Sequence, residues 1–535
     1  MANEKVKKVN TANSASKSDI WYKIIAIFIG IVLVFGALVA VIEPTGISDY
    51  ISMHTTTALK SENYKFNNAH LTYMVYYYYN QEYSQYASYG YASSAGFDTS
   101  KPLSEQKYWG STTKSWLDYF LENAISNLKQ CLVLCEEAKA NNVSLTDEEL
   151  QTVKDQVKEM KKYAKESGVS LGQMYGSKGI KASDIEYLLE LQSLATKYAT
   201  QVTDSFEYSD EDYEKYYSEN ENTYKFFDYY SYTVKAEYET NATDAEKKAA
   251  TEEAKAAADA IKAAIDGGKD FVTAVYEYEK TLEEEKESEK KDEETSADTK
   301  ASDDKKEEEK TEEEKIEDLK EELLTEGGAY TKDDEFSEWA YGEDAAVNAT
   351  KVIEETEAYS VFQLISLPAR YEYKTANIYA IYMYGDSFKA TDKLTSEQVM
   401  KETAAEVQAK IDEFVAKTDK TGEDFVAIAD QFKDRNVNVT ELIENVDKKT
   451  MDSQLGIEGF DDWAFAEGIA EGNVKVFEDE EDGVYAAIYY AGAGVESWKN
   501  NVDGDMRSAD YEEAYKALEE KHPVTVNEKA TAKID

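Results

Sequence analysis

The strongest periodic pattern of apolar residues begins at Trp116. Apolar side chains then recur three or four residues apart, at Leu117, Phe120, Leu121, Ala124, Ile125, Leu128 and Leu132. This spacing is typical of an amphipathic helix. A second segment starts with Thr146 followed by Glu149, a capping box that marks the start of a helix. We therefore predict a helical domain over residues 64–222, completed by a C-terminal helix over residues 505–522.

The stretch LTYMVYYYYNQEYSQYASYGY, residues 71–91, contains nine tyrosines and is predicted to be the first helix of this domain. One stripe of the helix, expected to face the core, holds Leu71, Met74, Val75 and Tyr78. Other angles are taken by Tyr73, Tyr76, Tyr77 and Tyr83. Because tyrosine offers a large amphipathic area at low entropic cost, these four side chains are candidates for binding a polypeptide. The alternative is that they pack against the C-terminal helix.

An uncharged run of nineteen residues, 24–42, is long enough to cross a membrane. Five lysines precede the run, which puts residues 1–23 in the cytoplasm and the rest of the chain outside. The sequence thus predicts a single-pass protein of the cell membrane, with most of the chain extracytoplasmic. A cleaved signal peptide is the alternative.

The pattern changes at Tyr224 to a β-branched and aromatic run, followed by an Ala-rich helix. Two blocks then recur: GKDFVTAVYEY as GEDFVAIADQF, and FSEWAYGEDAAVNATKVIE as FDDWAFAEGIAEGNVKVFE. This duplication predicts two copies of one small α/β domain, over residues 224–368 and 371–498, before a C-terminal helix and tail over 499–535. The first copy holds an acidic run, residues 280–325, predicted to be a disordered insertion because it has almost no apolar residue.

Composition excludes several classes of function. A net charge of −50 disfavours nucleic acid as a partner. The two cysteines, Cys131 and Cys135, stand four residues apart among leucines, so we expect them in the core. Two thiols without a nearby histidine make an incomplete ligand set, and no metal site or cofactor is predicted.

With this order of segments, the chain resembles extracytoplasmic foldases of the SurA/PrsA type. The residues that carry the resemblance are EEAKANNVSLTDEEL in the helical region, SDEDYEKYYSENENTYKF before the first strand, and the repeated Phe-Val-Ala and Trp-Ala blocks. The resemblance implies a multidomain α+β fold with an N-terminal transmembrane helix, a helical SurA/trigger-factor-like chaperone domain, and two tandem parvulin-like α/β domains. Parvulin-like domains are peptidyl-prolyl cis-trans isomerases.

The histidines that such domains carry in their first and last strands are missing here. The positions that resemble them are Ser231 and Ser360 in the first copy, and Ala380 and Tyr485 in the second. The only histidines of the chain, His54, His70 and His522, lie outside both copies. No catalytic residue is therefore nominated, and we expect weak isomerase activity or none.

These expectations combine into a chaperone that binds unfolded or partly folded secreted polypeptides. The alternative is an envelope interaction or adhesion protein built on the same scaffold. A hydrolase is less favoured, because the sequence has no GxSxG or HExxH pattern.

Overall fold

The computed structural model describes residues 53–293, 311–391, 393–432, 435–448, 457–479, 483–532 and 534. These residues form two compact units. Unit 1 contains the described parts of residues 1–208, 376–492 and 504–535, and unit 2 contains residues 493–503 with the described parts of 209–375. Each unit is described by itself.

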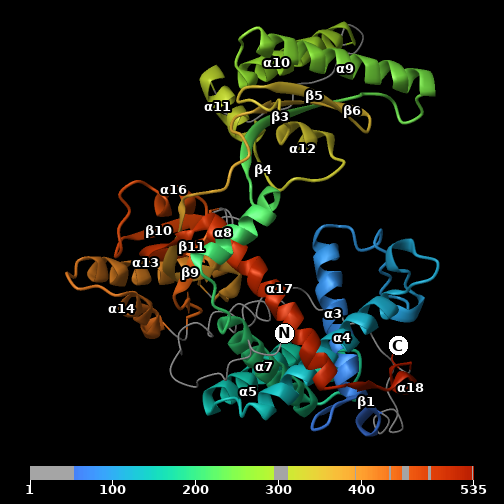
Figure 1. Cartoon of the computed structure of the whole chain (residues 1–535), viewed down its shortest axis with the longest axis vertical. Helices are drawn as coiled ribbons and strands as arrows, with labels where there is room; N and C mark the ends of the chain where they lie inside the picture. Colours follow the sequence, from blue (N-terminus) through green and yellow to red (C-terminus); the bar gives the residue numbers. More distant parts are fainter. Residues whose placement is uncertain are drawn as a thin grey trace. The chain divides into compact units, whose positions relative to one another are not determined.

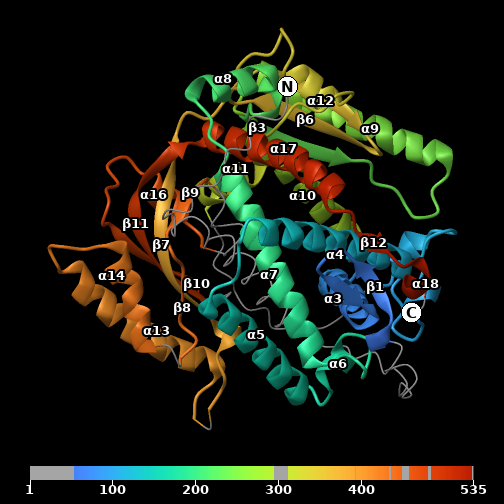
Figure 2. The same ribbon diagram turned by 60° about the horizontal axis from the view of Figure 1, so that its bottom comes forward.

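The first part of unit 1 is a helical lobe (Figure 2). It consists of α3 (Asn68–Ser88), α4 (Trp116–Ala140), α5 (Asp147–Glu166), α6 (Leu171–Met174), α7 (Ala182–Asp204) and the 3-10 turns η1 (Leu103–Glu105) and η2 (Tyr108–Gly110). The predicted capping box at Thr146 is present: its side chain accepts the amide of Glu149, whose carboxylate accepts the amide of Thr146. The C-terminal segment belongs to the same unit, since α17 (Ser497–Lys521) places Tyr515 and Leu518 against the helical core and α18 (Glu528–Thr531) follows it.

A three-stranded antiparallel sheet also belongs to this lobe, which the sequence had indicated to be wholly helical. Its order is β12 (Thr525–Val526), β1 (Thr57–Lys60) and β2 (Lys65–Asn67). The strands have two to four residues, too short for a visible alternation. Leu59 pairs with Val526, a partner so distant in sequence that no local pattern could reveal it.

The second part of unit 1 is an antiparallel sheet of order β10-β11-β7-β8, with β9 also paired to β7. Its strands are β7 (Lys374–Tyr384), β8 (Asn438–Val439), β9 (Ile443–Val446), β10 (Val474–Asp479) and β11 (Val484–Glu496). One face packs against α13 (Ser396–Val415), α14 (Gly422–Val426) and η6 (Ala427–Phe432), and the other against α16 (Phe460–Ala464). The turn η5 (Gly385–Ser387) follows β7.

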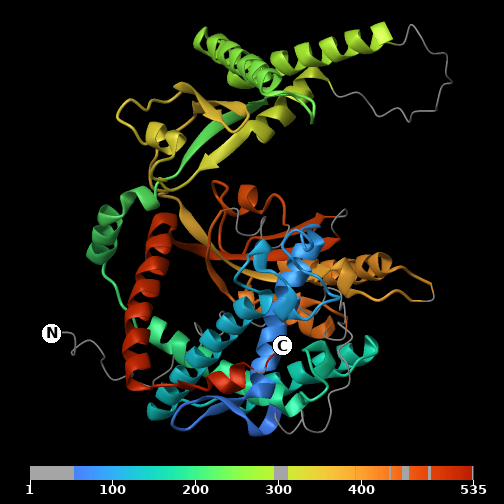
Figure 3. The ribbon, with the colours of Figure 1, turned by 90° about the vertical axis from the view of Figure 1, so that its right-hand side faces the viewer.

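Unit 2 contains a sheet of order β4-β3-β6-β5, formed by β3 (Phe227–Lys235), β4 (Leu324–Gly327), β5 (Thr350–Glu355) and β6 (Ala358–Leu364). Helices α9 (Asp244–Asp266), α10 (Phe271–Glu293) and α11 (Glu312–Leu323) cover one face, and α12 (Glu335–Ala340) packs on the other (Figures 1 and 3). Helix α8 (Asp210–Glu219) and the turn η3 (Glu221–Thr223) precede β3. In both larger sheets the last strand along the chain lies between the first strand and the strand just before the last.

The acidic run 280–325 is mostly helical in its described parts, and its last two residues begin β4. Helix α10 continues to Glu293, and α11 buries Leu319 and Leu323 in the core of unit 2. These two leucines are the apolar face that the abundant carboxylates obscured in the sequence. Residues 294–310 lie outside the described residues.

The predicted fold class is wrong. The structure is a mixed α/β protein with helices and three small antiparallel sheets, one of them inside the lobe predicted to be helical. Within the described ranges, no helix is both long and apolar enough to span a bilayer. The predicted transmembrane segment 24–42 and the tail 1–23 lie outside those ranges.

Candidate binding site: an exposed aromatic loop

Helix α3 starts at a cap formed by Asn67 and His70. The Asn67 side chain accepts the amides of Ala69 and His70, and His70 Nδ1 accepts the Asn67 amide at 3.0 Å. From residue 66 to residue 97 the only Asp, Glu, Lys or Arg is Glu82. The helix is therefore aromatic and almost uncharged, although the protein as a whole is strongly acidic.

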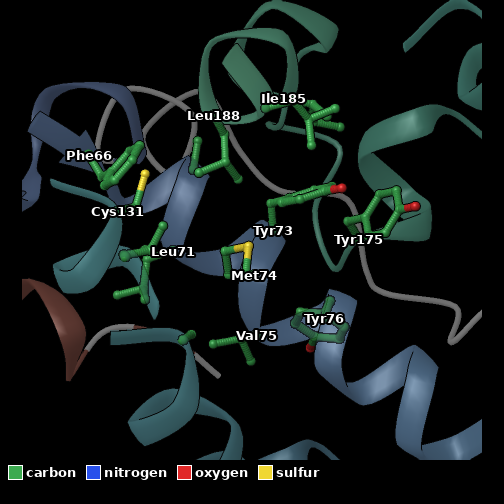
Figure 4. Packing of buried hydrophobic residues seen from close by; sticks show 14 of the residues in the cluster. Phe66, Leu71, Tyr73, Met74, Val75, Tyr76, Cys131, Tyr175, Ile185 and Leu188 are labelled. Atoms are coloured by element: carbon green, nitrogen blue, oxygen red, sulfur yellow. The ribbon is translucent and has the colours of Figure 1, made fainter. Parts of the chain in front are cut away.

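Most of the predicted core stripe of α3 is buried, and two of the four candidate binding tyrosines are buried with it. Leu71, Met74 and Val75 lie in the core, whereas Tyr78 is half-buried. The ring of Tyr73 lies 4.5 Å from the ring of Tyr175, centroid to centroid (Figure 4). Tyr76 covers Gly176 so closely that a Cβ atom there would meet the ring at 2.2 Å. Burial raises the pKa of Tyr73 far above its usual range.

The other two candidates, Tyr77 and Tyr83, are half-buried. Tyr77 packs against the helical core, where its ring contacts Tyr73 and Tyr78. Tyr83 lies 5.6 Å from the ring of Tyr79 and 5.6 Å from that of Phe97. All four predicted residues thus belong wholly or partly to the packing of the lobe.

Residues 89–114, which we call the aromatic loop, connect α3 to α4. The loop is held on a base of stacked rings: Phe97 lies 4.1 Å from Trp116, and Trp116 lies 5.2 Å from Phe120. The buried indole of Trp116 donates to the carbonyl oxygen of Ala95 at 3.0 Å. Aromatic pairs in such contact add stabilisation beyond the area they bury, so the loop has a fixed base.

Three aromatic side chains of this loop point into solvent. Tyr89, Tyr91 and Trp109 are 69%, 61% and 49% exposed, and they are the only aromatic residues among the strongly exposed large apolar side chains of the described ranges. Two of them contact Tyr86: the amide of Tyr91 donates to the Tyr86 carbonyl at 2.8 Å, and the centroid of the Trp109 ring lies 5.3 Å from that of the Tyr86 ring. Tyr89 follows Tyr86 by three residues in the sequence. We call Tyr89, Tyr91 and Trp109 the exposed aromatics.

Turn-forming neighbours mark these three residues in the sequence. Tyr89 and Tyr91 flank Gly90 directly after the helix, and Trp109 precedes Gly110 and a Ser-Thr-Thr run. Large aromatic residues among turn formers are placed in a loop, where burial is not assured. Helical periodicity, by contrast, indicates only the tyrosines that precede the loop.

In the first repeated domain, Ser231 and Ser360 lie on one face of the sheet. Ser231 pairs with Phe362 and Ser360 with Thr233, and directly paired residues point to the same side. The buried Ser360 hydroxyl donates to Glu355 Oε1 at 2.5 Å. Its proton is therefore used, and the Thr233 hydroxyl donates to Ser360 Oγ at 2.7 Å. These bonds form a closed polar network with no imidazole.

In the second repeated domain, Ala380 and Tyr485 lie on opposite faces of the sheet. Ala380 belongs to the core under α16, whereas Tyr485 belongs to the core under α13 and donates to Gln408 Oε1 at 3.2 Å. The structure does not bring these two positions together.

The register of the closing hairpins explains the misplacement of Tyr485. Tyr359 pairs with Glu354, and Tyr485 pairs with Glu478 at the same distance from the matched Lys-Val blocks. Tyr485 is therefore the counterpart of Tyr359. The counterpart of Ser360 is Ala486, which pairs with Phe477 and shares the core of Ala380. Both positions of the second copy are thus alanines.

Among the described residues, no three or more His, Cys, Asp and Glu side chains are grouped so that they could hold a metal ion. Cys131 and Cys135 are free and buried, and Cys135 Sγ donates to the Leu191 carbonyl at 3.2 Å.

No family model matches the chain, and no curated protein matches it. The resemblance to the SurA/PrsA-type foldases thus stays a prediction that rests on the residues quoted for it.

Proposed function

We propose that this protein is an extracytoplasmic foldase-like chaperone that binds unfolded or partly folded polypeptides through the exposed aromatics. The observation that carries the proposal is the presence of Tyr89, Tyr91 and Trp109 in solvent on a base of stacked rings. Folding alone gives no reason to leave three aromatic side chains in solvent, because burying each one would remove a large apolar area from water.

Such a surface suits clients of varied sequence. Tyrosine and tryptophan present large rigid areas and lose few rotamers on binding. The loop's base is already packed, so binding needs little ordering of the chaperone itself, which lowers the entropic cost of association. The phenol and indole edges also form hydrogen bonds with the backbone of an extended client.

The isomerase part of the family's activity is proposed to be weak or absent. The positions that resemble the family's histidines hold Ser231 and Ser360 in one copy and alanines in the other. Location at the cell membrane is a proposal that rests on the apolar sequence of residues 24–42 alone.

The test is suppression of client aggregation by the full chain and by a triple variant, Tyr89→Ser, Tyr91→Ser and Trp109→Ser. The matched control is Val347→Ser, Leu367→Ser and Val415→Ser, which removes three exposed apolar side chains elsewhere. We expect the loop variant to lose suppression and the control to retain it. Equal suppression by both variants would reject the proposed site. Retrieval of one folded partner or a glycan by the full chain, rather than many unfolded polypeptides, would favour the adhesion alternative.

A further inference from the structure

The charge of the protein is distributed unevenly along the sequence. Residues 53–208, which include the aromatic loop, contain 15 lysines against 19 acidic residues. Residues 209–535 contain 39 basic and 86 acidic residues. The exposed aromatics therefore belong to a nearly neutral part of a chain whose net charge is −50.

Three carboxylates in the loop or just after it are already engaged. Asp98 forms an ion pair with Lys101 at 2.7 Å, and Glu122 forms one with Lys114 at 2.6 Å. Asp118 accepts both the amide and the hydroxyl of Ser115. Residues 89–114 contain two acidic and three basic residues, so the loop itself has little net charge with which to select a client.

A net charge of this size acts over longer distances. A strongly negative protein raises the local concentration of cations and speeds their diffusional association by about 10- to 1,000-fold at low ionic strength. This field depends on the total charge, and salt screens it over a Debye length of about 10 Å at 0.1 M. Charge that lies away from the contact changes the association rate, whereas desolvated contacts set the dissociation rate.

We propose that the preferred clients are cationic polypeptide segments, selected by the net charge of the chain during association and retained by the exposed aromatics after contact. This inference rests on the proposed function, because it presumes that the aromatic loop is the contact. It divides the work between two sets of residues: acidic residues distributed over positions 209–535 determine how fast a client arrives, and Tyr89, Tyr91 and Trp109 determine how long it stays.

Two unstructured fluorescent peptides of about 20 residues test the inference. Both carry the same Phe- and Leu-containing centre, flanked in one by four lysines and in the other by four glutamates. Stopped-flow mixing with the full chain gives association and dissociation rates between about 20 mM and about 500 mM NaCl. At low salt we expect the lysine peptide to associate at least about tenfold faster. At high salt the two association rates should converge, and the dissociation rates should agree within about threefold throughout.

The triple loop variant separates this inference from the proposed function. It should release both peptides faster by a similar factor and leave the salt dependence of association unchanged. Equal association of the two peptides at low salt, with the loop variant still releasing both faster, would overturn the charge selection alone. No binding of either peptide at any salt concentration, or no change in release from the loop variant, would overturn the proposed function and this inference with it.

Discussion

The Trp109 ring lies edge-on against the Tyr86 ring, with centroids 5.3 Å apart and planes at 88°. The backbone of Trp109 is left-handed, with φ 46° and ψ 41°. This conformation costs a non-glycine residue roughly 1–2 kcal/mol, and strain of this kind concentrates at functional sites. The protein thus holds an indole half in solvent at a conformational cost that burial does not explain.

Trp109→Gly should separate folding from binding. Glycine adopts the left-handed backbone freely, which offsets the loss of the contact with Tyr86, about 1 kcal/mol. We expect the free energy of unfolding to change by less than about 1 kcal/mol and client suppression to fall. Urea unfolding and an aggregation assay on the same sample measure both. A large loss of stability would show that the indole is needed for folding.

His70 should make the helical lobe sensitive to acid. It is 6% exposed, and Nδ1 accepts the Asn67 amide, so the neutral ring carries its proton on Nε2, which has no hydrogen-bond partner among the described residues. Burial lowers the pKa of His70 to about 4, against a smaller opposing effect of Asp184 and a small one of His54 in the same direction. The unfolded chain therefore binds more protons between pH 6.5 and pH 4, and stability falls as the pH falls through this window.

The size of this effect is about 2 kcal/mol between pH 7 and pH 5. His70→Gln keeps a side-chain acceptor at the third position of the helix, as in a capping box, but does not titrate. Urea unfolding of both proteins at pH 7 and pH 5 should show a smaller loss for the variant. Identical losses would contradict the assignment of acid sensitivity to His70.

Glu137 should hold the C-terminal segment to the helical lobe. It accepts Lys521 Nζ at 2.7 Å and His522 Nε2 at 2.5 Å, and its side chain is 10% exposed. Burial alone would raise the pKa of Glu137, but the hydrogen bonds from Lys521 and His522 lower it. The Lys521 side chain is 55% exposed and that of His522 is 14% exposed, so we take the cost of losing the carboxylate as about 1–3 kcal/mol, the value for hydrogen bonds to a charged group.

Glu137→Gln should therefore lower the free energy of unfolding by about 1–3 kcal/mol. Glu519→Gln is the control, because its ion pair with Lys129 is partly exposed and such pairs contribute about 0–1 kcal/mol. Hydrogen exchange of Leu59 and Val526, which pair between β1 and β12, should accelerate only in the first variant. Equal protection in both variants would show that the sheet holds without Glu137.

Full-length protein should accelerate prolyl isomerisation of a peptide little or not at all. The barrier is about 20 kcal/mol; the counterpart positions lack histidine, and the Ser360 hydroxyl is already committed to Glu355. Ser360→Ala, which copies Ala486, should leave the rate at the uncatalysed level. A clear catalytic rate that Ser360→Ala abolishes would contradict this view of the sheet face.

Local patterns were sufficient for the long helices and for the repeat. The apolar spacing after Trp116 predicted α4. The spacing from Trp339 to Lys351 equals that from Trp463 to Lys475, and the matched strands β5 and β10 each lie at one edge of a sheet, next to its last strand. Each signal relates residues that are close in the sequence, and such residues are also close in the structure.

Non-local relationships could not be predicted. Leu59 pairs with Val526, which is very far from it in the sequence. The hairpin between β10 and β11 is two residues longer than that between β5 and β6, so the counterpart of Ser360 is Ala486; Tyr485, one residue before it, lies on the opposite face of the sheet. In α3, Tyr76 is buried by residues from other elements, such as Gly176. The angular position of Tyr76 on the helix could not indicate this burial.

The most direct test of the binding surface is photo-crosslinking of an unfolded client to single sites. A photoreactive amino acid at position 91, where Tyr91 is 61% exposed, is compared with one at position 415, where Val415 is 45% exposed. The account predicts client crosslinks at position 91 that excess unlabelled client removes, and only background at position 415. Equal crosslinking at both positions, or none at position 91, would contradict it.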